Sequence, residues 1–324
     1  MKLIIQIPCY NEEETLEITL NDLPTKLEGI HKIEHLIIND GSHDNTLQVA
    51  KDWGVHHIVD LKRNKGLARG FMAGIDECLR QGADIIVNTD ADNQYVGEDI
   101  AKLIQPIIQG KADMVIGERP IDQTEHFSFL KKKLQRLGSW VVRIASKTEV
   151  PDAPSGFRAY TRDCALRLNV ASEYTYTLET IIQAGRNKMS VVSVPIRTNP
   201  ELRKSRLFKS MFGYVKRSVI AICRAYLMYR PLKFFTLIGL VPFTIGFALG
   251  LRYIYFMITG LGTAGGHIQS LLLSVLLILL GAIIGVVGLL ADIIAANRRI
   301  LEDIRYETRK SSFGLTSEGD NGEK

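Results

Sequence analysis

The sequence predicts an α/β fold with a mostly parallel sheet, followed by amphipathic interface helices and two transmembrane helices. Short apolar, β-rich runs alternate with helical periodicity through about the first 200 residues, a pattern typical of a parallel sheet with helices on both faces. Between Leu202 and Phe234 there are nine Lys and Arg residues and no Asp or Glu. From Phe234 to Ala291 the only charged side chain is Arg252. A soluble domain, a basic segment and a membrane segment therefore follow one another.

The elements of the soluble part are assigned from β-rich runs and from helical periodicity. The expected strands are Leu3–Pro8, His35–Asn39, His57–Leu61, Asp84–Asn88, Asp113–Gly117 and Ser190–Ile196. The expected helices are Glu13–Leu23, Thr46–Trp53, Leu67–Gln81 and Ile100–Gln109. Ligands of such sheets bind beyond the carboxyl ends of the strands, so polar motifs that directly follow strands are the first candidates for a site.

Two basic amphipathic helices are expected near residues 127–146 and 207–229. Their Lys and Arg residues alternate with bulky apolar residues, which suits a helix lying in a membrane interface. The alternative for each is an ordinary helix packed on the sheet with a solvated basic face. The basic charge has no nucleic-acid-binding motif beside it, so we expect anionic lipid rather than nucleic acid as the partner.

The two apolar spans, Phe234–Ile258 and Gln269–Ala291, each reach the roughly 20 residues needed to cross a bilayer. Their connection, residues 259–267, has no Lys or Arg, whereas basic residues flank both outer ends. The positive-inside rule therefore predicts an integral membrane protein with its catalytic domain and both termini in the cytoplasm. The spacing of Gly246 with Gly250 and of Gly281 with Gly285 favours close helix packing within or between subunits.

The expected organisation has four parts. These are a catalytic domain (1–200), a basic juxtamembrane amphipathic helix (201–232), two transmembrane helices (233–296) and a cytoplasmic polar tail (297–324), disordered after Lys310. The four cysteines lack CxxC spacing and the seven histidines lack zinc-ligand spacing. A disulfide framework and a zinc site are therefore not expected.

The segment Asn88-Thr89-Asp90-Ala91-Asp92-Asn93-Gln94 directly follows an apolar strand. Two carboxylates separated by one residue at a strand end are suited to bind one hard cation together with phosphate oxygens. We expect Mg²⁺ or Mn²⁺ to be held by Asp90 and Asp92, with Gln94 adding a neutral oxygen. The alternative is a strand-end turn with acidic caps.

Three further motifs occur in the same region. They are Pro8-Cys9-Tyr10-Asn11-Glu12-Glu13, Asn39-Asp40-Gly41-Ser42-His43-Asp44-Asn45-Thr46 and Asn64-Lys65-Gly66-Leu67-Ala68-Arg69-Gly70. With the paired aspartates, this set resembles the nucleotide-sugar half of the family-2 glycosyltransferases, which have the GT-A fold.

The resemblance implies that Asp40 accepts a hydrogen bond from the nucleotide base. It also implies that Asp90 lies near the ribose or the metal and that Asp92 ligates the metal. The other residues it implies for the nucleotide site are Pro8, Tyr10, Asn11, Glu12, Lys65 and Gly66.

Two later segments sharpen the resemblance. Pro151-Asp152-Ala153-Pro154-Ser155-Gly156-Phe157-Arg158-Ala159-Tyr160 and Arg203-Lys204-Ser205-Arg206-Leu207 are similar to the polyprenyl-phosphate sugar synthases, the group that contains dolichyl-phosphate mannose synthase. The similarity covers roughly residues 1–230, and paired C-terminal spans occur in many members. The first expected basic helix differs in detail from that of these synthases. It has Lys132-Lys133-Leu134-Gln135-Arg136 where some members have Arg and Ser.

A phosphate acceptor fits the basic residues. Arg203 and Arg206 are candidates for the departing diphosphate, because guanidinium groups match phosphate oxygens. Candidates for the lipid phosphate are Arg119, Lys132 and Arg136. A phosphate nucleophile is already ionised and needs no general base, whereas a sugar hydroxyl would need a carboxylate such as Asp152 or Glu179. The alternative for each basic residue is a purely membrane-binding role.

The sequence therefore predicts an inverting, metal-dependent hexosyltransferase that moves one sugar from a UDP- or GDP-sugar to a polyprenyl (dolichyl or undecaprenyl) phosphate. Expected partners are the nucleotide sugar, the lipid phosphate, the bilayer and a second copy through the transmembrane helices. One alternative acceptor is a glycolipid, diacylglycerol or polysaccharide hydroxyl, although a QxxRW-like motif of processive enzymes is absent. The other alternative is a non-catalytic nucleotide-sugar sensor.

Overall fold

The computed structural model describes residues 1–120, 143, 146, 148–170, 176–200, 231–259 and 268–314. The chain divides into two compact units. The first contains Met1–Ile222 and Glu302–Lys324, and the second contains Cys223–Leu301. The two basic helices expected near residues 127–146 and 207–229 lie outside the described residues, apart from Arg143 and Ser146.

Seven strands of the described chain form one sheet in the first unit. They are β1 (Lys2–Cys9), β2 (Lys32–Asp40), β3 (His57–Leu61), β4 (Ile85–Asn88), β5 (Met114–Glu118), β6 (Arg158–Thr161) and β7 (Val191–Pro195). Their order is β3-β2-β1-β4-β6-β5-β7. Only β6 runs antiparallel to its neighbours within this described sheet. The carboxyl ends of β1, β2 and β4 therefore lie along one edge.

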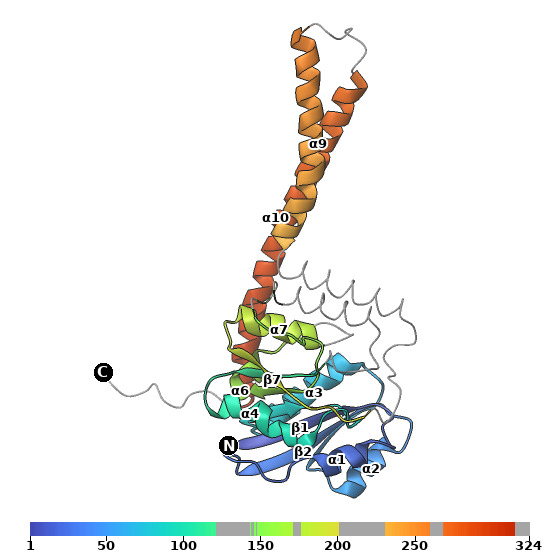
Figure 1. Cartoon of the computed structure of the whole chain (residues 1–324), viewed down its shortest axis with the longest axis vertical. Helices are drawn as coiled ribbons and strands as arrows, with labels where there is room; N and C mark the ends of the chain where they lie inside the picture. Colours follow the sequence, from blue (N-terminus) through green and yellow to red (C-terminus); the bar gives the residue numbers. More distant parts are fainter. Residues whose placement is uncertain are drawn as a thin grey trace, which may run out of the picture. The chain divides into compact units, whose positions relative to one another are not determined.

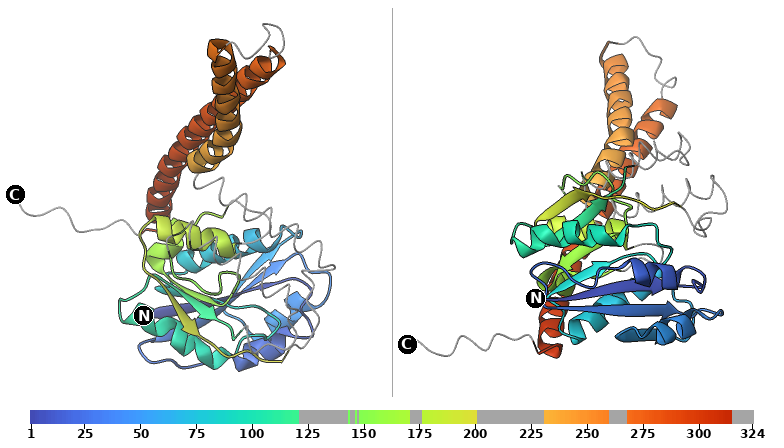
Figure 2. Two further views of the ribbon diagram at one scale, coloured as in Figure 1. Left: turned by 45° about the horizontal axis from the view of Figure 1, so that its top comes forward. Right: turned by 60° about the horizontal axis from the view of Figure 1, so that its bottom comes forward.

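Helices cover both faces of this sheet (Figures 1 and 2). They are α1 (Leu16–Asp22), α2 (Thr46–Trp53), α3 (Leu67–Arg80), the short 3₁₀ helix η1 (Gly97–Asp99), α4 (Ile100–Ile108), α6 (Arg162–Arg167) and α7 (Thr177–Arg186). On one face Ile5 and Ile7 of β1 pack with Leu20 of α1 and Leu103 of α4. On the other face α3 packs on β1 and β2. The predicted mostly parallel sheet with two helical layers is confirmed.

The sequence patterns missed β6, α6 and α7. Strand β6 has only four residues, and its first, Arg158, is fully buried. A buried arginine gives no apolar signal, so periodicity does not predict a strand there. The six-residue α6 is likewise too short to show a helical repeat.

His35 of β2 is a buried histidine with an exposed fraction of 5%. Neither ring nitrogen has a hydrogen-bond partner in the described structure. The ring lies edge-on to Trp53, with centroids 5.2 Å apart, and 5.5 Å from His56. Burial, and secondarily the charge of His56, lower the pKa of His35 to about 4. A protonated His35 is therefore costly in the folded unit.

We expect acid to destabilise the first unit through His35. In the unfolded chain this histidine titrates near pH 6.5, so between pH 6.5 and 4 the unfolded state binds a proton that the folded state does not. The contribution of His35 to the free energy of unfolding is complete above pH 6.5. It falls as the pH drops, and about 2 kcal/mol is lost by pH 5. The difference between the thermal midpoints at pH 7.5 and pH 5.0 should be larger in the wild type than in His35→Phe. The exposed His31→Gln should behave as wild type, and equal losses in all three proteins would contradict the assignment.

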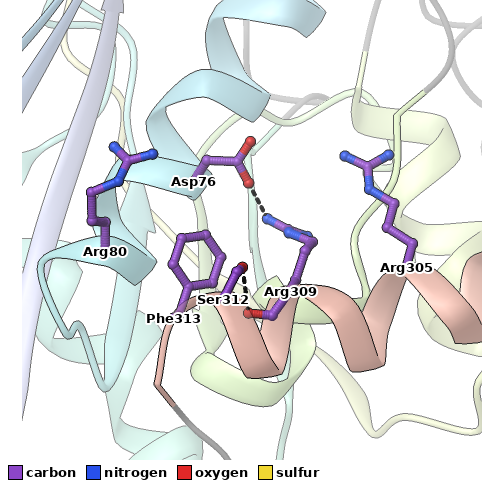
Figure 3. A pocket seen from close by; sticks show the side chains of 6 residues that line it. All are labelled: Asp76, Arg80, Arg305, Arg309, Ser312 and Phe313. Atoms are coloured by element: carbon purple, nitrogen blue, oxygen red, sulfur yellow. Dashed lines mark hydrogen bonds and ion pairs between the residues drawn. The ribbon is translucent and has the colours of Figure 1, made fainter.

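The end of α10 (Ile268–Ser312) is part of the first unit. Arg309 is 7% exposed and donates hydrogen bonds to the carbonyl oxygens of Ala165, Leu166 and Leu168 at 3.1, 2.8 and 3.0 Å. It also pairs with Asp76 of α3. Figure 3 shows this pair, with Arg80 and Arg305 on its two sides at a cavity of about 510 Å³. The polar tail expected from residue 297 is thus helical to Ser312, and its described part from Glu302 packs within the first unit.

The second unit contains α9 (Pro231–Thr259) and the apolar part of α10. Both helices are long and apolar enough to cross a membrane, with mean hydropathies of 2.1 and 2.9 over 18 residues. Small residues line their contact. A methyl group added at Gly281 would lie 2.7 Å from the carbonyl oxygen of Gly239 and 2.7 Å from Cβ of Phe243. The Ser274 hydroxyl donates to the carbonyl oxygen of Gly246 at 2.7 Å.

We expect Gly281→Leu to disrupt the packing of α9 on α10. The backbone of α9 leaves no room for the new side chain, and overpacking of this kind costs about 1–3 kcal/mol. The thermal midpoint of the detergent-solubilised protein measures the effect. Gly285→Leu is the matched control one turn away, because nothing lies within 4 Å of its added methyl group. Equal midpoints for the two variants would show that this contact does not hold the helices together.

Candidate active site

The loops that follow β1 and β2 are joined by backbone-to-side-chain hydrogen bonds. The backbone N–H of Asn11 donates to the Ser42 hydroxyl at 3.0 Å, and the N–H of His43 donates to Oδ1 of Asn11 at 2.8 Å. The N–H of Glu12 donates to the Thr46 hydroxyl at 2.7 Å. Asn11 has a positive φ of 56°, a conformation that asparagine tolerates better than most residues. The two predicted nucleotide motifs therefore form one structure.

Asp40 at the end of β2 fixes the loop that leads into α3. Its two carboxylate oxygens accept the N–H groups of Lys65 and Gly66 at 2.7 and 2.9 Å. Gly41 allows this close approach, because a Cβ there would lie 2.5 Å from the carbonyl carbon of Arg63. Three predicted nucleotide-site residues, Asp40, Lys65 and Gly66, are thus brought together. A contact of Asp40 with a base stays a prediction.

A cavity of about 330 Å³ opens beside these loops. It is lined by Asn11, Glu13, Glu14, His43 and Asp44. Tyr10 is 38% exposed and lies edge-on to His43, with ring centroids 6.5 Å apart. Pro8 lies in β1 opposite Ile38, and Glu12 is buried below the loop. Three carboxylates around this cavity disfavour a phosphate and suit a neutral hydrogen-bonding group such as a nucleoside.

Asp90 and Asp92 lie two and four residues beyond the end of β4 and are half-buried. Burial, followed by the negative charge of Asp92, raises the pKa of Asp90 well above its ordinary value. The positive charge of Arg119 works in the opposite direction. Oδ1 of Asp92 accepts the N–H of Gln94 at 3.3 Å. The predicted pair is therefore an anionic site whose carboxylates repel each other.

This site fits a hard divalent cation. Neighbouring half-buried carboxylates are stabilised when a cation lies between them. Among the described residues, no group of three or more His, Cys, Asp or Glu side chains is arranged to hold a metal ion. A cation at Asp90 and Asp92 would thus keep positions for other oxygen ligands, as Mg²⁺ does when it binds phosphates. Ligation by Gln94 stays a prediction.

Arg119, a predicted cation for the lipid phosphate, is held by Asp152. Its Nε and Nη2 donate to the two carboxylate oxygens at 2.8 and 3.0 Å. Asp152 is fully buried. Burial opposes the charge of Arg119, but Tyr95 and Asp152 outweigh it and raise the arginine pKa above its ordinary value. Arg119 is therefore a fixed positive charge near Asp90.

Residues that the sequence patterns did not indicate hold the predicted metal loop, residues 89–94, in place. The N–H of Asn199 donates to the carbonyl oxygen of Gln94 at 2.9 Å, and Nδ2 of Asn199 donates to that of Asn93 at 3.0 Å. Arg197 pairs with Asp99 at 2.8 Å. These partners are about 100 residues apart in the chain, so no local pattern predicts them. The described chain up to Pro200 thus runs beside this loop.

Four predicted site residues lie outside the described residues: Lys132, Arg136, Arg203 and Arg206. Their roles stay predictions. The strand-end motifs, Asp90, Asp92 and Arg119 are described and lie at the carboxyl edge of the sheet.

Comparison with known proteins identifies relatives. A model of glycosyl transferase family 2 matches residues 4–168. UDP-N-acetylglucosamine–dolichyl-phosphate N-acetylglucosaminyltransferase of Methanococcus voltae is 32% identical over 214 residues, which are 59% of this chain and 83% of the relative. Undecaprenyl-phosphate 4-deoxy-4-formamido-L-arabinose transferase of Yersinia enterocolitica is 28% identical over 323 residues, with 95% and 91% covered.

The fold also matches a solved structure. Glucosyl-3-phosphoglycerate synthase from Mycobacterium tuberculosis, crystallised with Mn²⁺, UDP and phosphoglyceric acid, gives a TM-score of 0.53 at 16% identity. The match covers 68% of this chain and 78% of that one, and it confirms the predicted GT-A-like fold. The family model spans about half of the chain, including both strand-end motifs and the paired aspartates. The chain therefore belongs to glycosyl transferase family 2.

Proposed function

We propose that the protein moves one sugar from a UDP- or GDP-sugar to a polyprenyl phosphate, dolichyl or undecaprenyl, with inversion at the anomeric carbon. The observation that carries the proposal is the pair Asp90 and Asp92 at the carboxyl edge of the sheet, with the fixed cation Arg119 nearby. The names of the two relatives above contain dolichyl phosphate and undecaprenyl phosphate as acceptors. Their similarity supports the same class of acceptor for this chain.

Asp90 and Asp92 would hold Mg²⁺ or Mn²⁺, with Gln94 as a third oxygen donor. The bound cation supplies charge neutralisation for a diphosphate leaving group. Glucosyl-3-phosphoglycerate synthase was crystallised with Mn²⁺ and UDP and also with Mg²⁺ and UDP, which supports this choice of metals. The cavity between Asn11 and Asp44 lies where the predicted nucleotide motifs meet and suits the nucleoside end of the donor.

The chemistry requires no general base when the acceptor is a phosphate. An ionised phosphate oxygen forms the bond to the anomeric carbon while the bond from that carbon to the diphosphate oxygen breaks, and the electron pair leaves with the diphosphate. A hydroxyl acceptor would need a carboxylate to take its proton. Both oxygens of Asp152 are engaged by Arg119, and Glu179 is 5% exposed. These two carboxylates are poorly placed as bases, which favours phosphate over a hydroxyl.

Cations complete the proposed site. Arg119 is one candidate for the acceptor phosphate, and Lys132 and Arg136 are the others. Arg203 and Arg206, proposed for the diphosphate, follow in sequence directly after the segment that Asn199 ties to the metal loop. Fixed cations aimed at a developing diphosphate charge lower the barrier of such a transfer.

Helices α9 and α10 support membrane association, which suits a lipid acceptor. We infer that the catalytic unit lies in the cytoplasm, because Lys and Arg flank the outer ends of the apolar spans and are absent from their connection. The basic residues between Leu202 and Phe234 would add attraction to anionic headgroups.

A panel of radiolabelled UDP- and GDP-sugars tests the proposal. The detergent-solubilised protein is supplied with polyprenyl phosphate or with diacylglycerol, each with and without EDTA. We expect label to enter the polyprenyl phosphate from one donor and EDTA to stop the transfer. Label in diacylglycerol would establish a hydroxyl acceptor instead. Nucleotide-sugar binding without transfer to either lipid would indicate a sensor.

A further inference from the structure

Asn88, the last residue of β4, lies at the centre of a buried polar network. Its side chain is fully buried and uses all of its hydrogen-bonding groups. Nδ2 donates to the carbonyl oxygen of Gly156 at 2.9 Å and to the hydroxyl of Tyr176 at 2.8 Å. Oδ1 accepts from Nε2 of Gln6 at 3.0 Å. Buried polar networks that are fully satisfied make the surrounding structure rigid, and this one begins two residues before Asp90.

Gly156 is the backbone element that this network holds. Its carbonyl oxygen also accepts from the Tyr176 hydroxyl at 3.4 Å, and its N–H donates to the Tyr95 hydroxyl at 3.2 Å. The ring of Tyr95 stacks on Phe157 with centroids 4.8 Å apart. Both peptide groups of Gly156 are therefore fixed by side chains from other parts of the chain.

This held backbone borders the predicted metal site. A methyl group added at Gly156 would lie 3.2 and 3.3 Å from the two carboxylate oxygens of Asp90 and 3.1 Å from the Tyr176 hydroxyl. The Asp90 carboxylate thus borders the space beside Cα of Gly156, so the position of Gly156 limits where these oxygens can move. A side chain at this position would require the Asp90 carboxylate or the Tyr176 hydroxyl to shift by a few tenths of an ångström.

Tyr176 is itself fixed from a third direction. Its ring stacks on Phe71 of α3, with centroids 3.9 Å apart and planes 2° from parallel. It is 1% exposed and directly precedes α7. The Tyr176 hydroxyl therefore has a defined position, and it connects α3 and α7 to the backbone beside Asp90.

We propose that Tyr176 is a positioning residue for the metal site: with Asn88 it holds Gly156 against Asp90, and so keeps the Asp90 carboxylate in the orientation that binds a divalent cation. The inference rests on the proposed function, since it assumes a cation at Asp90 and Asp92. Tyr176 makes no contact with the reacting atoms in this proposal. It acts through the backbone of Gly156.

The test measures Mn²⁺ binding to the detergent-solubilised full chain by the electron paramagnetic resonance signal of free Mn²⁺, with UDP and then GDP present. Tyr176→Phe removes the hydroxyl and keeps the ring on Phe71. We expect it to weaken Mn²⁺ binding about tenfold, as loss of a group that orients a metal ligand does. The metal concentration that gives half-maximal transfer should rise by the same factor.

Tyr160→Phe is the matched control. Tyr160 is fully buried and its ring also contacts Phe71, with centroids 5.9 Å apart, but its hydroxyl is outside this network. We expect its Mn²⁺ affinity to equal that of the wild type. Equal affinities in both variants and the wild type would overturn the inference. So would an equal loss in both variants, because it would reflect general damage to the core.

A second variant covers the case in which Tyr176→Phe does not fold. Gly156→Ala places a methyl group against the Asp90 carboxylate and should also weaken Mn²⁺ binding, whereas wild-type affinity in that variant would overturn the inference. A wild-type protein that binds no Mn²⁺ with either nucleotide would count against the proposed function itself. Failure of the inference and failure of the function are therefore distinguishable.

Discussion

Asp92→Asn should abolish sugar transfer to polyprenyl phosphate while leaving the protein folded. The substitution removes one negative charge and keeps the shape of the side chain, including the oxygen that accepts the N–H of Gln94. A divalent cation at this site supplies several kcal/mol of charge stabilisation to the departing diphosphate. Its loss should therefore lower the transfer rate by about 10³-fold. Incorporation of radiolabel from the active nucleotide sugar into polyprenyl phosphate measures the rate.

The control for this variant is Asp52→Asn, which makes the same atomic change at an exposed position in α2, where Asp52 pairs only locally with Gln48 among the described contacts. It should transfer sugar as the wild type does. Circular dichroism of both variants should match the wild type, since neither change removes apolar packing. Transfer by Asp92→Asn at the wild-type rate, still inhibited by EDTA, would place the essential metal elsewhere.

The edge of the sheet that carries the candidate site could be predicted because the residues of that site follow strands. Asp40 and Asp90 occur at or just after apolar runs, and parallel strands bring their carboxyl ends to one edge without further information. The sequence motifs therefore predicted which loops meet. They did not predict what each side chain does there, such as the hydrogen bonds of Asp40 to Lys65 and Gly66.

The sequence patterns could not predict contacts between residues that lie far apart in the chain. Arg158 is fully buried and donates to the carbonyl oxygens of Ala153, Ser155 and Thr177. A sequence pattern shows only an arginine in a glycine-containing motif, which suggests a surface role. Likewise, Tyr176 has no local feature that connects it to Asp90. Such roles depend on tertiary geometry and not on periodicity.

The C-terminal segment shows the same limit. Residues after Arg298 are rich in charge, which is typical of a solvated tail, and the sequence therefore predicted a polar extension. In the structure, Tyr306 donates to Asp163 at 2.6 Å and lies under the guanidinium of Arg167 at 3.9 Å. A helix whose charged residues alternate with residues that pack on the protein has the same sequence pattern as a helix fully exposed to solvent. The two can be told apart only when the surface on which the helix packs is known.

Arg309→Met should destabilise the catalytic unit although it lies more than 200 residues from the predicted metal loop in sequence. Helix α6 ends at Arg167, where the helical hydrogen-bond pattern stops, and the carbonyl oxygen of Ala165 accepts the N–H of Leu168 at 3.3 Å. Arg309 supplies the donors for Ala165, Leu166 and Leu168. Methionine keeps most of the length of the side chain but has no N–H groups. The three carbonyl oxygens therefore lose the hydrogen bonds from the Arg309 guanidinium. The pair with Asp76 is lost as well.

The expected cost is about 3 kcal/mol, because the substitution removes a buried charged donor that bonds three carbonyl oxygens and pairs with a carboxylate. For a unit of this size that corresponds to a fall of about 6–12 °C in the thermal midpoint. Arg305→Met is the control one turn earlier on the same helix, since Arg305 is exposed and its side chain hydrogen-bonds only to Asn169 among the described residues. Its midpoint should stay within about 1 °C of the wild type, given that isolated exposed contacts contribute little. Similar falls in both variants would mean that general loss of positive charge, and not the capping of α6 by Arg309, sets the stability of this region.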